Sequence, residues 1–310
     1  RETVMDLKII IEQLTVLFFL MAIGFLINKL GILNKEYNKC ISKLLLTIGI
    51  PGLLISSVAN GNPFENNYDI FNVLYVCTII HIFVIILALV VTKLFRFGNT
   101  ASVYRFMYVF PNAGFIGFPV INAIFGPEAL IYATVFQLPS NILCYTYGIY
   151  LMSGVGFNKN EALKSILNPC IVAALIACSL CILDIHLPNL IIECGSYLGS
   201  ITTPLGMVII GSSLASCEID VRKIDVRLYM NILIKMFLLP ILCYLFLSLI
   251  CNDAILIAVL TITFGLPAAT NTVVFANLYN KDIELASEGV FITTVMCLFS
   301  IPIICSLLFI

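Results

Sequence analysis

Apolar residues run along this chain in long stretches that short polar connections interrupt. Five stretches between successive charged residues, 69–93, 128–159, 164–184, 193–218 and 253–281, contain no charge at all. A helix needs roughly 20 mostly apolar residues to cross a hydrocarbon core of about 30 Å, and each stretch is close to that length or longer. Because the pattern covers almost the whole chain, it predicts an integral membrane protein built from helices.

The charged residues and the clusters rich in Gly, Pro and Asn divide the sequence into ten helices that could each cross the membrane. We number these helices as spans one to ten, and expect them near 9–29, 38–59, 70–92, 104–125, 129–152, 165–183, 192–216, 228–250, 254–278 and 285–309. The predicted fold class is therefore an all-α integral membrane protein with ten transmembrane helices.

Composition agrees with this class and argues against several functions. Of the 310 residues, 61% are hydrophobic and 11% are charged, whereas about 25% are charged in soluble domains. The chain has no G-x-x-x-x-G-K-[ST] motif, which disfavours an ATP-driven pump. Its only histidines, His81 and His186, form no H-E-x-x-H motif, which disfavours an intramembrane enzyme. We therefore expect no catalytic residues, no metal site, no cofactor and no nucleic-acid partner.

Lysine and arginine fall on alternate connections. Thirteen of these sixteen residues lie in or beside loops one, three, five, seven and nine, whereas loops 60–69, 126–128, 184–191 and 251–253 contain none. Short cytoplasmic loops are enriched in lysine and arginine. We therefore expect a multi-pass protein of the cytoplasmic membrane with the odd-numbered loops in the cytoplasm and both termini outside it.

The second half of the sequence repeats features of the first half. Pro51 and Pro204 lie 153 residues apart, and each is followed by a Ser-Ser pair and an alanine; Pro111 and Pro267 lie 156 residues apart. Both offsets are close to half of the chain. Because five spans are an odd number, a second copy enters the membrane from the opposite face, as in many secondary transporters. The sequence thus predicts two inverted five-helix repeats, 1–155 and 156–310; the alternative is a coincidence among proline-containing helices.

Spans four and nine are expected to be broken. Span four places two prolines and two glycines within residues 111–119, and span nine contains the sequence GLPAATN at 265–271. Proline lacks the amide N–H and glycine is flexible, so both backbones should unwind near the membrane middle. Unwound backbone at that depth must face protein or a water-filled cavity. The alternative is a pair of ordinary proline kinks in which asparagine caps the freed carbonyls.

Helix N-termini at such breaks carry a partial positive charge and free N–H groups, which favour an anion. The asparagine and threonine side chains beside the prolines can orient a carboxylate. We therefore expect a substrate-binding site formed by Pro111, Asn112, Gly114, Gly117, Pro119, Pro267, Thr270 and Asn271.

Four more polar side chains are expected inside the spans, as candidates for ion coupling or for support of the breaks. Lys235 and Glu288 lie at similar depths in spans eight and ten, and either pair with each other or snorkel separately. His81 in span three either packs or carries a proton. Gln137 in span five either ligates Na⁺ or supports span four. The sequence assigns neither Na⁺ nor H⁺ as a coupling ion.

The chain resembles the auxin efflux carrier family over nearly its full length, most specifically in 110–137, 202–215 and 265–287. The resemblance implies ten helices in two inverted repeats that cross at spans four and nine, and a relation to the bile acid:sodium symporter architecture. It also implies a scaffold of helices one, two, six and seven and a transport domain of helices three to five and eight to ten. The lack of a long loop between spans five and six indicates a compact, bacterial-type carrier.

The family's known substrates are small organic anions, including dicarboxylates and indole acetate. Taken with the breaks, the resemblance predicts a secondary carrier that moves a small organic anion, a carboxylate, by elevator-type alternating access. A passive channel or a membrane-bound sensor on the same fold is the alternative. The expected partners are this substrate and the lipid bilayer, and a homodimer through the scaffold helices is left open.

Overall fold

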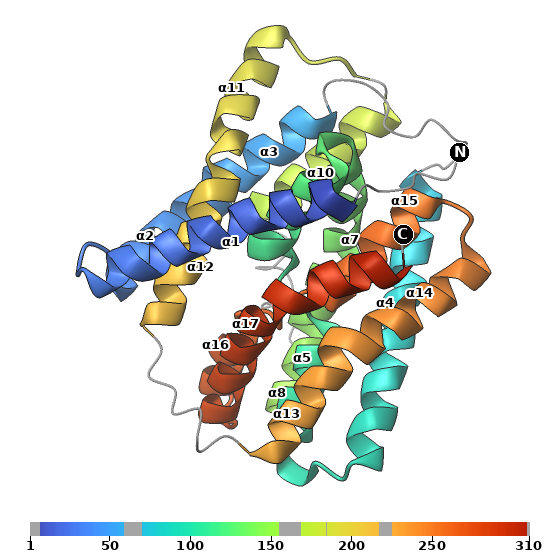
Figure 1. Ribbon diagram of the computed structural model, residues 1–310. Coiled ribbons are helices and arrows are strands. Elements are labelled where there is room, and N and C mark those ends of the chain that lie inside the picture. Colours follow the sequence, from blue (N-terminus) through green and yellow to red (C-terminus); the bar gives the residue numbers. More distant parts are fainter. Residues whose placement is uncertain (1–6, 59–69, 155–168, 184, 217–224, 309–310) are drawn as a thin grey trace. The chain divides into compact units, whose positions relative to one another are not determined.

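A computed structural model describes residues 7–58, 70–154, 169–183, 185–216 and 225–308 (Figure 1). Within these ranges the chain forms helices, turns and loops, with one isolated β-bridge, so the predicted all-α class is confirmed. Predicted loop two, 60–69, lies outside the described residues, and so do most of the predicted loops 153–164 and 217–227. The boundary between the predicted repeats and the charges of Lys159, Lys164, Arg222 and Lys223 lie there as well.

Six described helices are long and apolar enough to cross a membrane: Ile11–Lys29, Lys35–Ser56, Ile70–Leu94, Asn189–Ala215, Val226–Ile250 and Ile283–Leu308. Shorter apolar helices cover Ala113–Phe125, Pro169–Leu180 and Ala254–Gly265. Predicted spans four and nine are each divided by a break, and predicted span five is a helix that polar residues such as Gln137 and Asn141 make less apolar. The structure therefore supports a multi-pass membrane protein, while the number ten stays a prediction.

The chain folds into two compact units, which are described one at a time. Unit one consists of Arg1–Val73, Gly114–Leu138 and Leu167–Glu218. Its helices are α1 (Leu7–Lys29), α2 (Lys35–Leu44), α3 (Ile50–Val58), α6 (Phe118–Phe125), α10 (Pro169–Ile182), α11 (Asn189–Ser200) and α12 (Thr202–Ala215), and it also contains the first part of α7 (Leu130–Leu143). A π-helical turn, η1 (Leu45–Gly49), joins α2 to α3.

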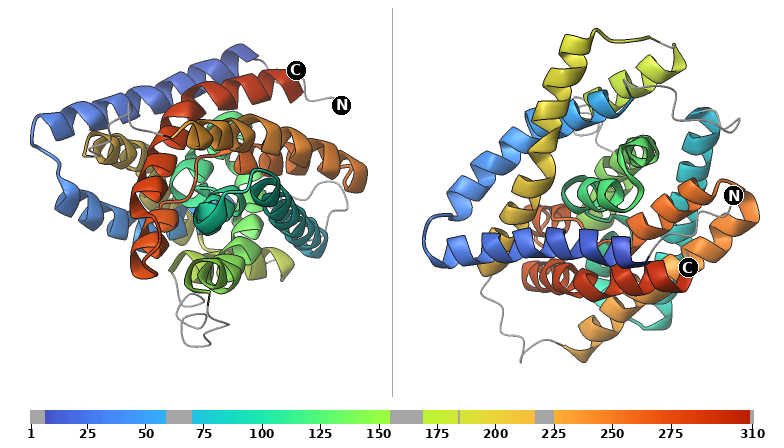
Figure 2. Two further views of the ribbon diagram at one scale, coloured as in Figure 1. Left: turned by 90° about the horizontal axis from the view of Figure 1, so that it is seen from below. Right: turned by 45° about the horizontal axis from the view of Figure 1, so that its top comes forward.

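Glycines bring the helices of unit one into backbone contact. A Cβ added at Gly24 of α1 would collide with the backbone of Val208 in α12, and one added at Gly211 of α12 would collide with the backbone of Met21. The two helices therefore cross at a spacing that only glycine allows at these points. Figure 2 shows α3 crossing α11 in the same unit, where Gly52 and Gly195 face each other's carbonyl oxygens. Such small-residue contacts are typical of helix packing in membranes.

Unit two consists of Leu74–Ala113, Pro139–Ile166 and Ile219–Ile310. It contains α4 (Ile70–Leu94) from Leu74 onward, α5 (Ala101–Val109), α8 (Ile149–Ser153), α13 (Val226–Leu233), α14 (Leu239–Ile250), α15 (Ala254–Gly265), α16 (Asn271–Leu278) and α17 (Ile283–Leu308). Two π-helical turns lie within its helices: η5 (Cys144–Gly148) between α7 and α8, and η7 (Ile234–Leu238) between α13 and α14.

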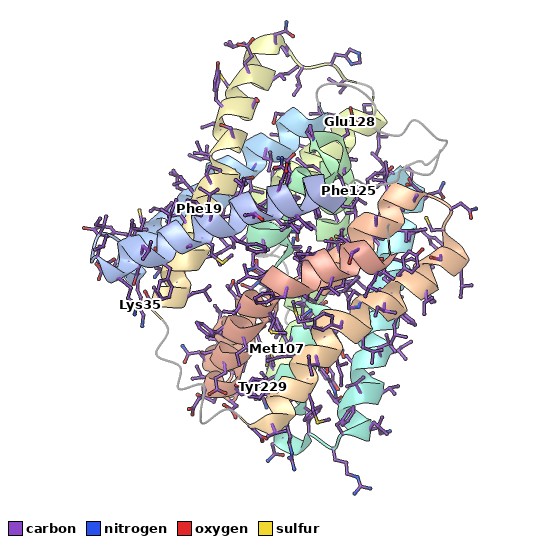
Figure 3. All side chains as sticks on the ribbon, viewed as in Figure 1. Phe19, Lys35, Met107, Phe125, Glu128 and Tyr229 are labelled. Atoms are coloured by element: carbon purple, nitrogen blue, oxygen red, sulfur yellow. The ribbon has the colours of Figure 1, made fainter. Side chains whose placement is uncertain are left out.

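Polar caps and tight packing position the helices of unit two. The Asp253 side chain accepts hydrogen bonds from the N–H groups of Ile255 and Leu256 and so fixes the start of α15. Met107, which Figure 3 labels, packs its sulfur against Gly289, so that α5 approaches α17 closely. The α15 helix is buried along nearly its whole length, from Leu256 to Gly265.

Large apolar side chains are exposed on both units. Phe19 of α1, labelled in Figure 3, is 68% exposed, and Leu249 of α14 is 84% exposed. In water such residues would form an aggregation-prone surface. In a bilayer they face lipid tails, where an apolar side chain is favoured. The outer surface therefore agrees with the apolar composition. Cys40 and Cys194 are exposed and carry free thiols.

Candidate functional site

The first break follows α5. Phe110 leaves the helical region with φ −114° and ψ 96°, and Pro111 and Asn112 continue without helical hydrogen bonds until η3 (Ala113–Gly117) begins. The predicted unwound segment 111–119 is therefore too long. Helical structure resumes at Ala113, because a π-helical turn accommodates the two glycines, and Pro119 follows this turn at the second position of α6.

This break also divides the predicted site residues. Pro111 and Asn112 belong to unit two, whereas Gly114, Gly117 and Pro119 belong to unit one. Within unit one, the Gln137 amide nitrogen lies 3.7 Å from where a Cβ on Gly114 would be. Gln137 thus packs beside η3, in a place where it can support the turn.

The second break lies where the sequence predicts it. The α15 helix ends at Gly265, Leu266 is extended with φ −67° and ψ 159°, and α16 begins at Asn271. Pro267 has no N–H to donate, so the helical ladder cannot continue through it. Leu266 to Ala268 are fully buried or nearly so, whereas Thr270 is exposed.

The two breaks pair with each other through their backbones inside unit two. Pro111 and Ala268 form an isolated antiparallel bridge. The Asn112 N–H donates to the Pro267 carbonyl at 2.8 Å, and the Ala269 N–H donates to the Phe110 carbonyl at 2.9 Å. The Ala268 N–H donates to the hydroxyl of Thr293 in α17 at 3.1 Å. These bonds satisfy backbone groups that the breaks remove from the helices, which is required away from water.

Polar side chains remain at the start of α16 after this pairing. The Thr270 hydroxyl makes no capping bond to the helix although threonine is a common cap residue. The Asn271 amide nitrogen lies 3.8 Å from the Cys144 sulfur, at the far limit of a weak hydrogen bond. Thr272 is fully buried, and its hydroxyl has no hydrogen-bond partner among the residues that the structure describes. A helix N-terminus with uncommitted hydroxyl and amide groups can receive an anion.

Asn112 is placed differently from Asn271. It is only 7% exposed, and its backbone N–H is used in the pairing of the breaks. Asn271 is half-buried at the first position of α16. The two asparagines therefore share a short region of unit two but differ in how much of each is reachable.

Pairing of Lys235 with Glu288, one of the two alternatives that the sequence leaves open, does not occur among the described residues. The Lys235 ammonium is buried and donates to the Phe264 carbonyl at 3.4 Å, while Glu288 on α17 is half-buried. His81 is also fully buried. Its Nδ1 lies 2.6 Å from the Cys77 carbonyl one turn earlier in α4, and its ring packs edge-on against Phe264 at 5.4 Å.

Sequence reasoning did not select three residues that the structure places at the breaks. Thr293 accepts the Ala268 N–H, Cys144 contacts Asn271, and Thr272 is the buried threonine of α16. Thr272 directly follows the motif GLPAATN, so the sequence alone places its hydroxyl next to Asn271. Nothing in the sequence links Thr293 or Cys144 to the breaks, because they come from α17 and η5. In the described part of the chain, no group of three or more His, Cys, Asp or Glu side chains could hold a metal ion.

Comparison with known proteins identifies the family. The sequence model of the family described as "Membrane transport protein" matches residues 9–161 and 155–305. An uncharacterized transporter of Methanocaldococcus jannaschii is 24% identical over 305 residues, which are 94% of this chain and 96% of the relative. An uncharacterized transporter of Methanothermobacter thermautotrophicus is 21% identical over 303 residues, again 94% of this chain and 96% of the relative. The chain therefore belongs to the membrane transport protein family, the auxin efflux carrier family that its sequence resembles, and is a membrane transporter rather than an enzyme.

Proposed function

We propose that this chain is a secondary carrier that moves a small organic anion, a carboxylate, across the cytoplasmic membrane. The observation that carries the proposal is the pairing of the two breaks beside the start of α16. The pairing uses the backbone groups of Phe110, Asn112, Pro267 and Ala269, and leaves the side chains at the start of α16 for a ligand.

Electrostatics around the second break favour an anion. No charged side chain occurs from Ala254 to Asn280, so this segment itself places no acidic residue beside a carboxylate at the start of α16. The N-terminus of a helix carries about half a positive charge, and this partial charge is weakly screened where water is scarce. The Asn271 amide and the exposed Thr270 hydroxyl supply donors of the kind that orient a carboxylate, and the Thr272 hydroxyl is a further donor that is buried in this structure.

Proteoliposome transport tests this function directly. Proteoliposomes that contain the purified protein and are loaded with a small carboxylate should exchange it for labelled carboxylate from outside. The label should then accumulate transiently inside by counterflow. Conductance far above the turnover of a carrier would instead indicate a passive channel. Binding without flux would indicate a membrane-bound sensor. Either of these two outcomes would overturn the carrier proposal.

We further propose that the chain has ten transmembrane helices in two inverted five-helix repeats, with both termini outside the cytoplasm. The family model matches two stretches of similar length, 9–161 and 155–305, which supports an internal repeat. The half-chain offsets of the proline pairs support it as well. Sidedness rests on the alternation of lysine and arginine along the loops. A single cysteine introduced at each terminus of the protein tests the sidedness. In right-side-out vesicles an impermeant thiol reagent should label this cysteine without lysis, and labelling only after lysis would contradict the proposal.

An elevator-type movement is proposed for transport. The resemblance assigns helices one, two, six and seven to a scaffold, and unit one contains α1–α3 and α10–α12, which correspond to these helices. Helices eight to ten of the proposed moving domain correspond to α13–α17, all in unit two, whereas Gly114–Leu138 group with unit one. A homodimer through the scaffold helices is proposed on the same resemblance.

Crosslinking tests the movement. A pair of cysteines, one in the Lys35–Ser56 span and one in α5, should form a disulfide that traps one state and stops flux. Reduction of the disulfide should restore flux. The exposed native Cys40 and Cys194 need replacement by serine in this background. A crosslinked protein that still transports at the full rate would contradict a rigid movement, and would leave local gating around the breaks.

A further inference from the structure

Lys235 is a charged residue enclosed within unit two. It lies in the π-helical turn η7 and inside the candidate span Val226–Ile250, and only 2% of its surface is exposed. A long lysine side chain in a membrane helix commonly reaches back to the interface. Lys235 instead turns its ammonium inward, where it donates to the Phe264 carbonyl at 3.4 Å.

The carbonyl that Lys235 contacts belongs to the last turn of a half-helix. The α15 helix ends at Gly265, so the carbonyls of its last turn have no partner in a continuing helix. The Thr263 carbonyl accepts from the Leu266 N–H at 3.2 Å, and the Phe264 carbonyl accepts from Lys235. A helix C-terminus carries a partial negative charge that favours a cation.

In carriers with broken helices, the C-terminal ends of half-helices are places where a coupling cation binds. At the end of α15 an ammonium already provides a positive charge and hydrogen-bond donors. Among the described residues it forms no ion pair with a carboxylate, and Glu288 is not its partner. The charge of Lys235 is therefore directed to the helix end rather than to an acidic side chain.

The half-chain offset gives Lys235 a counterpart. His81 lies 154 residues before it, close to the 153 and 156 residues that separate the proline pairs. Both side chains contact Phe264, His81 through its ring and Lys235 through its ammonium. His81 uses Nδ1 within its own helix, on the Cys77 carbonyl, whereas Lys235 reaches across to α15. Of these two side chains, Lys235 is the one that donates a hydrogen bond to a carbonyl at the broken end of α15.

We propose that the Lys235 ammonium is a resident cation of the carrier, which neutralises the carbonyl end of α15 and takes the place of a dissociable coupling cation. The role as a substitute for a coupling ion rests on the proposed carrier function, whereas the role at the helix end does not. Na⁺ is then required neither for the stability of the fold nor for transport.

Cation rescue tests this role without a substrate. In Lys235→Ala the side chain is replaced by a space large enough for a small cation, whereas Lys235→Met removes the charge and fills the space. Lys93→Ala, at an exposed lysine near the end of α4, is the matched control. Melting temperatures of the detergent-purified proteins are compared in choline, sodium, ammonium and methylammonium chloride at one ionic strength.

We expect Lys235→Ala to melt roughly 3–10 °C below the wild type in choline, because a carbonyl at the helix end loses its donor. Ammonium or methylammonium should restore at least half of the loss, with no gain for Lys235→Met, Lys93→Ala or the wild type. A wild type that is stabilised by Na⁺, or a Lys235→Ala loss that no cation reverses, would overturn the proposal. If Lys235→Ala does not fold, a Met variant as stable as the wild type would overturn it as well.

Transport gives the second readout. Wild-type counterflow should run at the same rate in sodium and in choline, and a rate that depends on Na⁺ would contradict the resident cation. If no carboxylate is exchanged at all, the proposed function fails while the melting experiment still decides the role of Lys235.

Discussion

The break after α5 and the break after α15 meet in one backbone bridge, but they use their polar groups differently. At the first break, Asn112 is 7% exposed and helical structure resumes at the next residue. At the second break, three residues separate Pro267 from α16, and Thr270, Asn271 and Thr272 keep side-chain groups that the pairing does not use. A proline break alone does not make a binding site, because its backbone groups can be satisfied internally. Donors left over after that pairing are what a substrate can use.

A negative charge at position 271 is the strongest test of this difference between the two breaks. Asn271→Asp keeps the size of the side chain and places a negative charge at the start of α16. Two like charges about 4 Å apart repel strongly at low effective dielectric, so we expect transport of a carboxylate to fall about 100-fold. Asn271→Ala, which removes only the amide, should lower it about tenfold. Counterflow in proteoliposomes measures both.

Asn277→Asp is the matched control for that charge, because Asn277 is exposed on the same helix at its other end. If the position of the negative charge causes the loss, Asn277→Asp should transport the carboxylate at a rate within about twofold of the wild type. An Asn271→Asp protein that folds and transports normally would place the substrate elsewhere.

A smaller effect is expected from Thr272→Val, which removes a buried hydroxyl without changing the shape of the side chain. If the hydroxyl donates to the substrate, affinity should fall about fivefold, the loss of about one hydrogen bond, while the melting temperature stays the same or rises. Thr261→Val is the control, since its hydroxyl is also buried and has no partner in the described part of the chain, but lies within α15. Equal affinity in both variants and the wild type would remove Thr272 from the site.

Asn112→Ala should affect transport less than Asn271→Ala. The Asn112 side chain is buried and its backbone bond to Pro267 survives the substitution, so we expect a loss of about threefold in rate together with a lower melting temperature. Asn122→Ala, in α6 and ten residues later in the sequence, serves as the control for losing an asparagine. A larger loss of transport in Asn112→Ala than in Asn271→Ala would place the substrate at the first break rather than the second.

The smallest effect on transport, within about twofold, is expected for Thr293→Val. Its hydroxyl accepts the Ala268 N–H, so the substitution leaves a buried donor unsatisfied and costs about 1–3 kcal/mol of stability. Thr294→Val is the control, because the Thr294 hydroxyl donates within its own helix, to the Val290 carbonyl. Thermal unfolding of the two variants should therefore differ, and equal melting temperatures would show that the Thr293 bond contributes nothing.

Much of the fold follows from local chemistry that the sequence displays. Apolar stretches predict the helices, and Pro267 with its neighbours predicts the second break within a residue of where it occurs. The first break was predicted too long, because the propensities of Gly114, Gly117 and Pro119 do not reveal that a π-helical turn takes them up. Local composition marks where a helix is weak, and the hydrogen bonds actually formed decide how far it unwinds.

The partners of the breaks could not be predicted, because they depend on tertiary contacts. Thr293 reaches Ala268 from α17, and Cys144 reaches Asn271 from η5. Charge and depth left two alternatives for Lys235, a pair with Glu288 or a side chain that snorkels by itself, yet Lys235 contacts a backbone carbonyl. A pairing rule based on opposite charges overlooks the partial charge of a helix end, which carries no formal charge in the sequence.

Comparing a small carboxylate with its primary amide in the wild-type protein tests the central claim most directly. The two compounds have nearly the same shape, so the negative charge is the main difference between them. We predict that the carboxylate raises the melting temperature and is exchanged in counterflow, that the amide does neither, and that Asn271→Asp abolishes the response to the carboxylate. An amide that binds and exchanges as well as the carboxylate, or a carboxylate response that survives in Asn271→Asp, would contradict an anion site at the start of α16.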